Sequence, residues 1–397
     1  MIEEVIDNGN CSGCGFCASL DSSISMQLDR EGFLRPFMPE GATASVTTAS
    51  SADLFSRSCP GLLVSKPQST SNQYDLPGGL GSALSVWSAE ATDDVVRFVG
   101  SSGGALSALQ MFLLDTHRMA ATYGVAADDA DPERTVPHSA STSGDVMKSA
   151  GSRYAPSSSL VGANLLASDS VVVGKPCEIS ALRQSNGGGV GTPLRISFFC
   201  AGVPSQEATS RLVRSFVDPA VRIDQLRYRG HGWPGKFFVA AADGTEGSMS
   251  YSESWGRHLN QTLQWRCKIC PDGVGDSADI SGADYWDADE NGWPILDDRP
   301  GRTLLIAKTE RGLETVLGAE SAGYIRLAKV DLADFASVQR YQVDRRRSVA
   351  GRVLGGVVGG ATMPKYVGYG MVGKFARNVR QNLRAAVGTF RRVRNST

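Results

Sequence analysis

Short apolar runs separated by polar turns predict strands that alternate with helices along the middle of the chain. Residues 170–174 hold three consecutive valines, which is typical of a short buried strand, and residues 178–184 are patterned as a helix. The same succession returns at 194–199 and 205–217, with Pro204 near the first helical turn. Because strand–helix–strand units form parallel sheets, we expect an α/β fold with a mostly parallel or mixed sheet.

A glycine-rich turn, Ser101 to Gly104, lies between an expected strand at 95–99 and an expected helix at 105–115. The helix is apolar on nearly every side and is therefore predicted to be buried. Such a unit can hold an anionic group at the helix N-terminus, but taken alone it is better explained as a simple tight turn. The polar stretch 128–143 is expected to be a loop. The remaining strands are predicted at 121–126, 237–240 and 303–307, and a further helix at 312–319.

Near the N-terminus, the pattern predicts a small hairpin from residues 24–28 and 33–36, joined by a polar turn. Residues 40–58 are rich in Ser, Ala and Thr and are expected to form a loop and a short helix.

The end of the chain is patterned as a basic amphipathic helix. Residues 345–397 contain twelve Arg and Lys and no acidic residue, whereas residues 1–344 carry a net charge of −13. Such a helix suits an anionic membrane surface or an acidic partner, but it could also dock on the acidic body of its own chain or be disordered. Its apolar side chains recur every three or four residues: Val372, Phe375, Val379, Leu383, Val387 and Phe390.

Composition narrows the class of protein. An apolar content of 41% and a charged content of 20% over 397 residues are those of a globular protein. The acidic body argues against nucleic-acid binding. No signal-peptide pattern and no long apolar span is present, so we expect a cytoplasmic protein that contacts the inner face of a membrane at most through 371–397. In that compartment cysteines are reduced, and clustered cysteines indicate metal or redox chemistry.

Three of the eight cysteines, Cys11, Cys14 and Cys17, follow one another at two-residue gaps. This spacing is typical of a [4Fe-4S] site, since zinc sites usually present separated cysteine pairs. The next position of the bacterial ferredoxin pattern is Asp21, so the fourth ligand must come from elsewhere, and Cys59 before Pro60 is the candidate. Zinc or plain reduced thiols are the alternatives.

The other four cysteines form a second set. Cys177 and Cys200 follow predicted strands, where open α/β sheets place their ligands, and Cys267 and Cys270 form a C-x₂-C pair. Together they would complete a second [4Fe-4S] site. Half a zinc site, a dithiol or simple buried packing are the alternatives.

Taken together, these segments resemble the beta-subunit family of coenzyme F420-reducing hydrogenases and dehydrogenases, which also includes 7-hydroxymethyl chlorophyll a reductase. The resemblance covers most of the first 335 residues, in family order. The matching segments are 11–17, 59–61, 101–104, 151–154, 174–177, 199–200, 227–235, 267–270 and 278–281.

The resemblance implies an FAD-containing iron–sulfur oxidoreductase. Three parts are expected: a ferredoxin-like cluster-binding region at 1–80, an FAD and iron–sulfur domain at 81–340, and a basic tail at 341–397. Relatives commonly have Lys in place of Arg153, Thr in place of Lys175 and Gly in place of Ala283. Lys175 would therefore retune the cofactor pocket. The implied flavin contacts are Ser101, Ser102, Gly103, Gly104, Ser152, Arg153 and Tyr154.

The expected activity passes electrons between a hydride-carrying small molecule, such as reduced coenzyme F420, and the two clusters. An electron-transfer protein could be a further partner, and a homo-oligomer is compatible with the sequence. His231, in an aromatic loop, is the candidate proton donor, against a structural role. A reductase of surface-polysaccharide biosynthesis and a zinc-bound interaction protein without redox chemistry are the alternative functions.

Overall fold

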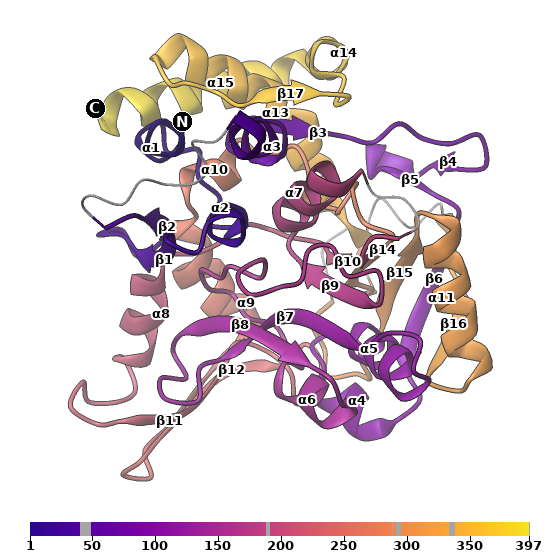
Figure 1. Ribbon diagram of the computed structural model, residues 1–397. Helices are drawn as coiled ribbons and strands as arrows, with labels where there is room; N and C mark the ends of the chain where they lie inside the picture. The colour runs from indigo at the N-terminus through magenta and orange to yellow at the C-terminus, as the bar shows by residue number, and fades with distance from the viewer. Residues whose placement is uncertain (40–48, 188–190, 288, 291–294, 333–337, 397) are drawn as a thin grey trace.

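The computed structural model describes residues 1–397 except 40–48, 188–190, 288, 291–294, 333–337 and 397 (Figure 1). Its centre is an eight-stranded mixed sheet with the order β16-β6-β15-β14-β10-β9-β7-β8. The neighbours β7, β9, β10 and β14 are parallel, and the other pairs of this sheet are antiparallel. The prediction of a mixed α/β sheet is therefore confirmed. The strands are β6 (Ser85–Ala91), β7 (Ala121–Ala127), β8 (Thr135–Ala140), β9 (Ser170–Gly174), β10 (Leu194–Phe198), β14 (Ile280–Asp284), β15 (Thr303–Ala307) and β16 (Ile325–Lys329).

Both faces of the sheet are covered, so alternate residues of a strand serve two cores. On β15, Leu305 packs against the helices that cover one face of the sheet, whereas Leu304 and Ile306 pack on the opposite face. The first face is covered by α4 (Asp94–Val99), α5 (Ala105–Asp115), α6 (Ser143–Lys148) and α11 (Glu310–Ser321). The opposite face is covered by α7 (Pro176–Asn186), the N-terminal cysteine segment and α13 (Arg340–Gly359).

Smaller units surround this core. A three-stranded antiparallel sheet packs on α8, and the predicted N-terminal hairpin is present as β1 and β2. The N-terminal elements are α1 (Ile2–Asp7), α2 (Phe16–Leu20), β1 (Ser25–Leu28), β2 (Leu34–Phe37), α3 (Ala49–Ser58), β3 (Leu63–Ser65), β4 (Tyr74–Asp75) and β5 (Ser82–Ala83). The middle elements are α8 (Gln206–Val213), β11 (Ile223–Arg227), β12 (Lys236–Ala241), β13 (Glu246–Ser250), α9 (Tyr251–Glu253) and α10 (Trp265–Lys268).

Two predicted elements are wrong. The segment 95–99 is not a strand but lies in the helix α4, because Asp93 caps it: its carboxylate accepts hydrogen bonds from the backbone N–H groups of Val95 (2.8 Å) and Val96 (3.0 Å). The stretch 128–143 is not a loop throughout, since it contains β8, which pairs with β7 at the edge of the sheet.

The tail is helical, as predicted, but it is broken into α14 (Met371–Arg377) and α15 (Val379–Ser396), which follow the short strand β17 (Lys365–Val367). These elements lie beside α13 at the top of Figure 1. Two glycines of α13 allow a close approach: a Cβ at Gly351 would come within 2.1 Å of the Asn382 carbonyl, and one at Gly355 within 2.1 Å of the Ala386 carbonyl. The two helices are therefore in backbone contact.

No helix within the described residues has both the length and the apolar character needed to cross a membrane.

The glycine contact predicts a large effect of one substitution. Gly355→Leu should lower the free energy of unfolding by about 3 kcal/mol, since the side chain must push α15 away. Gly388→Leu is the matched control, because a Cβ at Gly388 meets no atom within 4 Å. Chemical denaturation followed by circular dichroism checks both variants. Equal losses of stability would contradict the packing described here.

Candidate functional site

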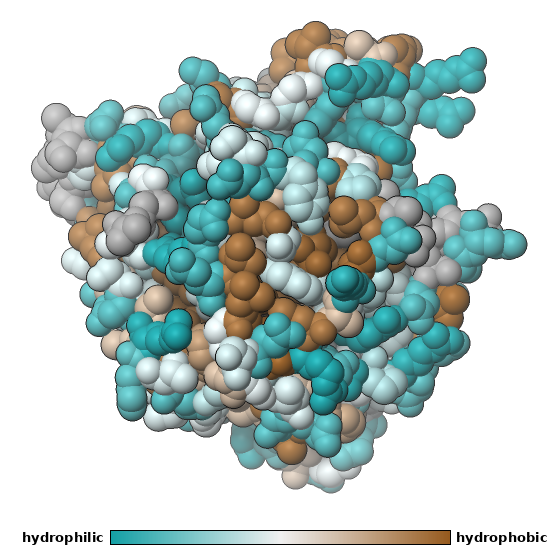
Figure 2. All heavy atoms as spheres, turned by 90° about the vertical axis from the view of Figure 1, so that its right-hand side faces the viewer, coloured by the Kyte–Doolittle hydropathy of each residue, from teal (hydrophilic) through white to brown (hydrophobic). Residues whose placement is uncertain are grey.

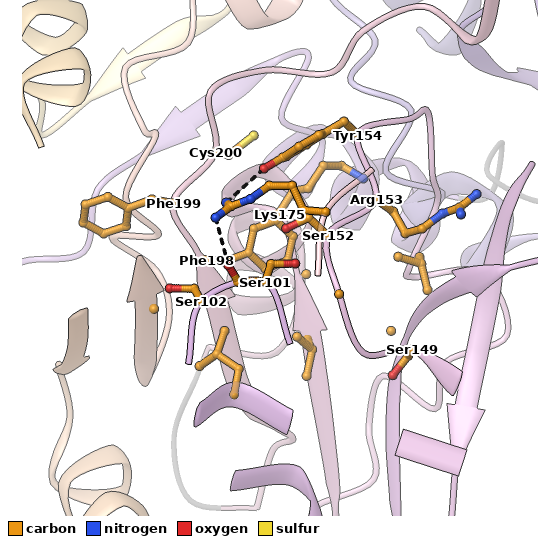
Figure 3. A pocket seen from close by; sticks show the side chains of 18 of the residues that line it. Ser101, Ser102, Ser149, Ser152, Arg153, Tyr154, Lys175, Phe198, Phe199 and Cys200 are labelled. Atoms are coloured by element: carbon orange, nitrogen blue, oxygen red, sulfur yellow. Dashed lines mark hydrogen bonds between the residues drawn. The ribbon is translucent and has the colours of Figure 1, made fainter. Parts of the chain in front are cut away.

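A cavity lies at the carboxyl ends of β9, β10 and β14, beside the N-terminus of α5 (Figure 3). Its wall includes Gly174 at the end of β9, Phe198 at the end of β10 and Asp284 at the end of β14. Gly104 and Ala105, where α5 begins, form another part of the wall. Because parallel strands end at one edge of a sheet, segments distant in sequence meet here.

Most of the residues predicted to bind a cofactor line this cavity. Gly103 does not. A Cβ at Gly103 would come within 2.9 Å of the Gly301 carbonyl, and one at Gly104 within 2.5 Å of the Val96 carbonyl. These glycines therefore permit contacts between backbones. The predicted residues that line the cavity are Ser101, Ser102, Gly104, Ser152, Arg153, Tyr154 and Lys175.

Two buried hydroxyl groups in the wall of the cavity lack a hydrogen-bond partner among the described residues: those of Ser101 and Ser159. A buried hydroxyl without a partner costs free energy, so both groups are available to a bound molecule. The Ser102 hydroxyl, in contrast, donates to the Arg302 carbonyl over 2.9 Å. Ser159 was not found by sequence reasoning, because the polar run in which it lies has no distinctive pattern.

Arg153 contributes mainly its backbone and the base of its side chain to the cavity. Figure 3 shows the side chain extending away from it. The guanidinium donates to the carbonyls of Pro132 (2.9 Å), Arg134 (2.8 Å) and Leu226 (3.2 Å). Its charge is therefore used to hold three segments of the protein together.

Lys175 is buried with Glu178 on the cavity wall. The ammonium group lies 2.5 Å from the Glu178 carboxylate and 3.0 Å from the Ser157 carbonyl. Burial alone would lower the pKa of Lys175, but Glu178 and then Cys177 outweigh it, so that the pKa is raised and the amine stays charged.

A buried ion pair that sequence reasoning missed connects two walls of the cavity. Arg229 donates to the Asp284 carboxylate over 2.7 Å, to the Ser101 carbonyl over 2.8 Å and to the Tyr154 hydroxyl over 3.3 Å. Burial opposes the charge of Arg229, yet Asp284 raises its pKa well above the ordinary value. The available signal was the position of Arg229 in the segment 227–235, one of those that carry the family resemblance.

His231, the candidate proton donor, is not brought to this cavity. It is exposed, with its ring 5.4 Å from that of Phe98, and it lines a neighbouring depression. Partial burial and then Arg227 lower its pKa. The position of His231 therefore gives no support to a role as proton donor at the cavity beside the carboxyl ends of β9, β10 and β14, which we call the main cavity.

The first cysteine set surrounds one small apolar cavity, whose wall includes Cys11, Cys14, Cys17 and Cys59. Burial raises the pKa of Cys17, and the neighbouring Cys14, Cys11 and Cys59 raise it further. Burial likewise raises the pKa of Cys14 to about 11. The structure therefore brings Cys59 to the N-terminal trio, so the thiolates of all four could share one positive group.

The structure brings Cys200 and Cys267 of the second set together. The N–H of Val203, three residues after Cys200, donates to the Cys267 sulfur over 3.4 Å, and Cys270 follows Cys267 three residues later. Burial raises the pKa of Cys200 to about 12. Gln264 links the two sets, because its side-chain amide donates to the Ser12 carbonyl, between Cys11 and Cys14, over 3.3 Å and to the Cys267 sulfur over 3.5 Å. Cys200 also lines the main cavity, so the second set adjoins it.

Two buried arginines flank the second set. Arg345 of α13 donates to the carbonyls of Cys200 (2.8 Å) and Cys267 (2.7 Å). Arg266 donates to the Pro60 carbonyl over 2.9 Å and thereby ties α10 to the loop of Cys59. Burial would lower the pKa of Arg345, but Cys270 is foremost among the groups that raise it.

Across the described part of the chain, no three Cys, His, Asp or Glu side chains are grouped so as to hold a single metal ion.

Comparison with known proteins decides the family. A family model for the C-terminal part of the coenzyme F420 hydrogenase/dehydrogenase beta subunit matches residues 168–332, and one for the N-terminal part matches residues 86–163. The chain belongs to this family. The predicted resemblance is therefore confirmed. Residues 333–397 and the first cysteine set lie outside both matches.

Members of the coenzyme F420 hydrogenase/dehydrogenase beta-subunit family are only distantly similar to the chain. It is 27% identical over 285 residues to coenzyme F420 hydrogenase subunit beta of Methanococcus voltae, covering 68% of this chain and 95% of the relative. It is 24% identical to the F420-dependent formate dehydrogenase 1 subunit beta of Methanococcus maripaludis, covering 60% of this chain and 59% of that protein.

A solved structure supports the fold. A chain of the F420-reducing [NiFe] hydrogenase complex from Methanosarcina barkeri superposes with a TM-score of 0.51 at 20% sequence identity, covering 70% of this chain and 94% of that chain.

The buried ion pair gives a testable prediction. Arg229→Gln leaves Asp284 buried without its partner, so the free energy of unfolding should fall by about 3–5 kcal/mol. Arg222→Gln is the matched control: its pair with Asp224 is exposed, at 71% and 44%, and should contribute about 1 kcal/mol or less. Denaturant titration measures both. A loss for Arg229→Gln no larger than that of the control would contradict the assigned role.

Proposed function

We propose that the chain is an iron–sulfur flavoprotein oxidoreductase that exchanges a hydride with coenzyme F420 or a similar small carrier. The observation that carries this proposal is that Cys11, Cys14, Cys17 and Cys59 line one small cavity, while Cys200, on the wall of the main cavity, lies beside the segment of Cys267. Family membership and the named activities of the relatives support the same conclusion.

We assign FAD to the main cavity. The unpartnered hydroxyls of Ser101 and Ser159 fit a polar ligand, and the N-terminus of α5 fits its phosphates. Ser102, Ser152, Tyr154 and Lys175 would form the remaining wall, and Gly103 would act indirectly by allowing the turn. Relatives commonly have Thr at the position of Lys175. Here a positively charged side chain lies on the wall of the main cavity, and this charge favours an electron-rich ligand.

We assign one [4Fe-4S] cluster to each cysteine tetrad. Cys11, Cys14, Cys17 and Cys59 would hold the first in a ferredoxin-like region, and Cys177, Cys200, Cys267 and Cys270 the second. Burial keeps these thiols neutral without a metal, so their ionisation would be coupled to cluster binding. When bound, the flavin supplies two-electron exchange and the clusters supply single-electron transfer.

The residues of this chain set the route and the direction of transfer. Cys200 lines the cavity and belongs to the second tetrad, and Gln264 lies between the two cysteine sets. Electrons would therefore leave toward the N-terminal face, where a protein partner could accept them. With these cofactors assigned, we divide the chain into a cluster-binding region at 1–80, an FAD and iron–sulfur domain at 81–340 and a basic tail at 341–397.

The function is tested on protein purified without air. It should absorb broadly near the blue end of the visible range, bleach with dithionite and oxidise reduced coenzyme F420 while it reduces an artificial dye. A colourless protein that holds zinc would overturn the proposal in favour of an interaction protein.

The role of Cys59 is tested by its replacement. Cys59→Ser should lower the iron content from about eight atoms per chain to about four, because only the first cluster is lost. Ser58→Ala is the matched control: its buried hydroxyl has no hydrogen-bond partner among the described residues, so the iron content should not change. Metal analysis measures both. An iron content unaffected by Cys59→Ser would remove Cys59 from the site.

Arg345 should control the reduction potential of the second cluster. Its positive charge stabilises the more negative, reduced state, so Arg345→Gln should lower the potential of one of the two clusters. Arg345→Lys should restore most of it, and Arg347→Gln, which alters an exposed residue of the same helix, should leave it unchanged. A redox titration followed by electron paramagnetic resonance measures the shift. An unchanged or raised potential would contradict this role.

A further inference from the structure

The three C-terminal helices expose an unusual amount of apolar surface. Ten of the seventeen large hydrophobic side chains that are exposed on the described part of the chain lie within residues 341–397. Figure 2 shows hydrophobic side chains at the top of the molecule, where Figure 1 places α13, α14 and α15. We call the exposed apolar residues of these helices the C-terminal apolar face: Leu354, Val357, Val358, Val372, Val379, Leu383, Val387 and Phe390.

The packing of α15 directs its apolar face outward. Along the first half of α15 the residues that contact α13 are small or polar: Gly355 meets the backbone of Ala386, and the Asn382 side chain accepts a hydrogen bond from the Gly351 N–H over 2.7 Å. Near the end of α15, Val393 and Phe390 lie against Gly359. A helix that served only to cover the protein would turn its apolar side inward. Val379, Leu383 and Val387 are instead left in solvent, with Leu383 51% exposed.

The two helices present their apolar residues on the same side. Gly351 lies against Asn382 and Gly355 against Ala386, so the helices run parallel. At 3.6 residues per turn, Leu354 and Val358 of α13 and Leu383 and Val387 of α15 are then rotated toward the same side of the pair. One continuous strip results, rather than two unrelated patches.

Positive charge borders this strip. Arg377, Arg380, Arg384 and Arg391 are all exposed, and no acidic residue occurs in 345–397. An apolar strip along a helix with arginines beside it is the pattern of a helix that lies in a membrane interface, with apolar side chains among the lipid chains and arginines at anionic headgroups.

We propose that the C-terminal apolar face binds the anionic surface of a lipid membrane, with α13 and α15 lying in its plane. A second copy of the chain is a poorer occupant, because a two-fold contact would set arginines against arginines. The described part of the same chain does not cover the face, since its side chains are exposed. Since the matches to the coenzyme F420 hydrogenase/dehydrogenase beta subunit end at residue 332, this surface is an addition to the family's catalytic part and does not depend on its cofactors.

Sedimentation with vesicles tests the proposal on the full-length protein. The chain should bind vesicles of phosphatidylcholine with phosphatidylglycerol, bind pure phosphatidylcholine vesicles at least tenfold more weakly, and be released by salt. Leu383→Glu combined with Val387→Glu, and separately Arg380→Glu combined with Arg384→Glu, should each lower the partition coefficient at least tenfold.

Leu317→Glu is the matched control, since Leu317 is a similarly exposed leucine (45%) in the helix α11 and its replacement should leave vesicle binding unchanged. Thermal unfolding followed by circular dichroism ensures that all variants are folded. Absence of binding to acidic vesicles, equal binding to neutral ones, or a wild-type dimer that Leu383→Glu dissociates would each overturn the proposal.

Discussion

The candidate site depends on one constraint of the fold. The neighbouring parallel strands β7, β9, β10 and β14 all end at the same edge of the sheet. Because these strands are parallel, the segments that follow them all lie at the same edge of the sheet, next to one another. Lys175 follows β9 directly and Cys177 lies in the first turn of α7, the loop after β10 carries Cys200, and β14 ends in Asp284. The cavity, one cysteine set and the buried ion pair are therefore consequences of one topological feature.

The strand and helix pattern predicted much of this arrangement, and the spacing of the cysteines indicated that Cys59 belongs with the N-terminal trio, which the structure places around one cavity. The predictions worked where local sequence and burial agree, as in β9, α7 and β10. They failed at 95–99, where the β-branched residues favour a strand but Asp93 caps a helix. The contacts of Arg229, Arg345 and Ser159 join residues far apart in the sequence, so no local pattern could have revealed them.

The C-terminal segment combines two roles that its sequence does not separate. On its inner side, Arg345 and Gln342 of α13 hold the loop of Cys200, so that the tail is part of the site. On its outer side, apolar residues and arginines face solvent. Amphipathic periodicity in α15 was visible in the sequence, but the side that faces the protein was not, since that depends on the glycines of α13.

The central claim is that two [4Fe-4S] clusters lie next to each other, with Gln264 between the two cysteine sets. Electron paramagnetic resonance of the fully reduced protein tests it most directly. Two reduced, paramagnetic clusters that lie next to each other interact magnetically. The account therefore predicts a broadened, split spectrum, which becomes simpler when only one cluster is reduced. A sum of two independent signals, or the signal of a single cluster, would contradict it.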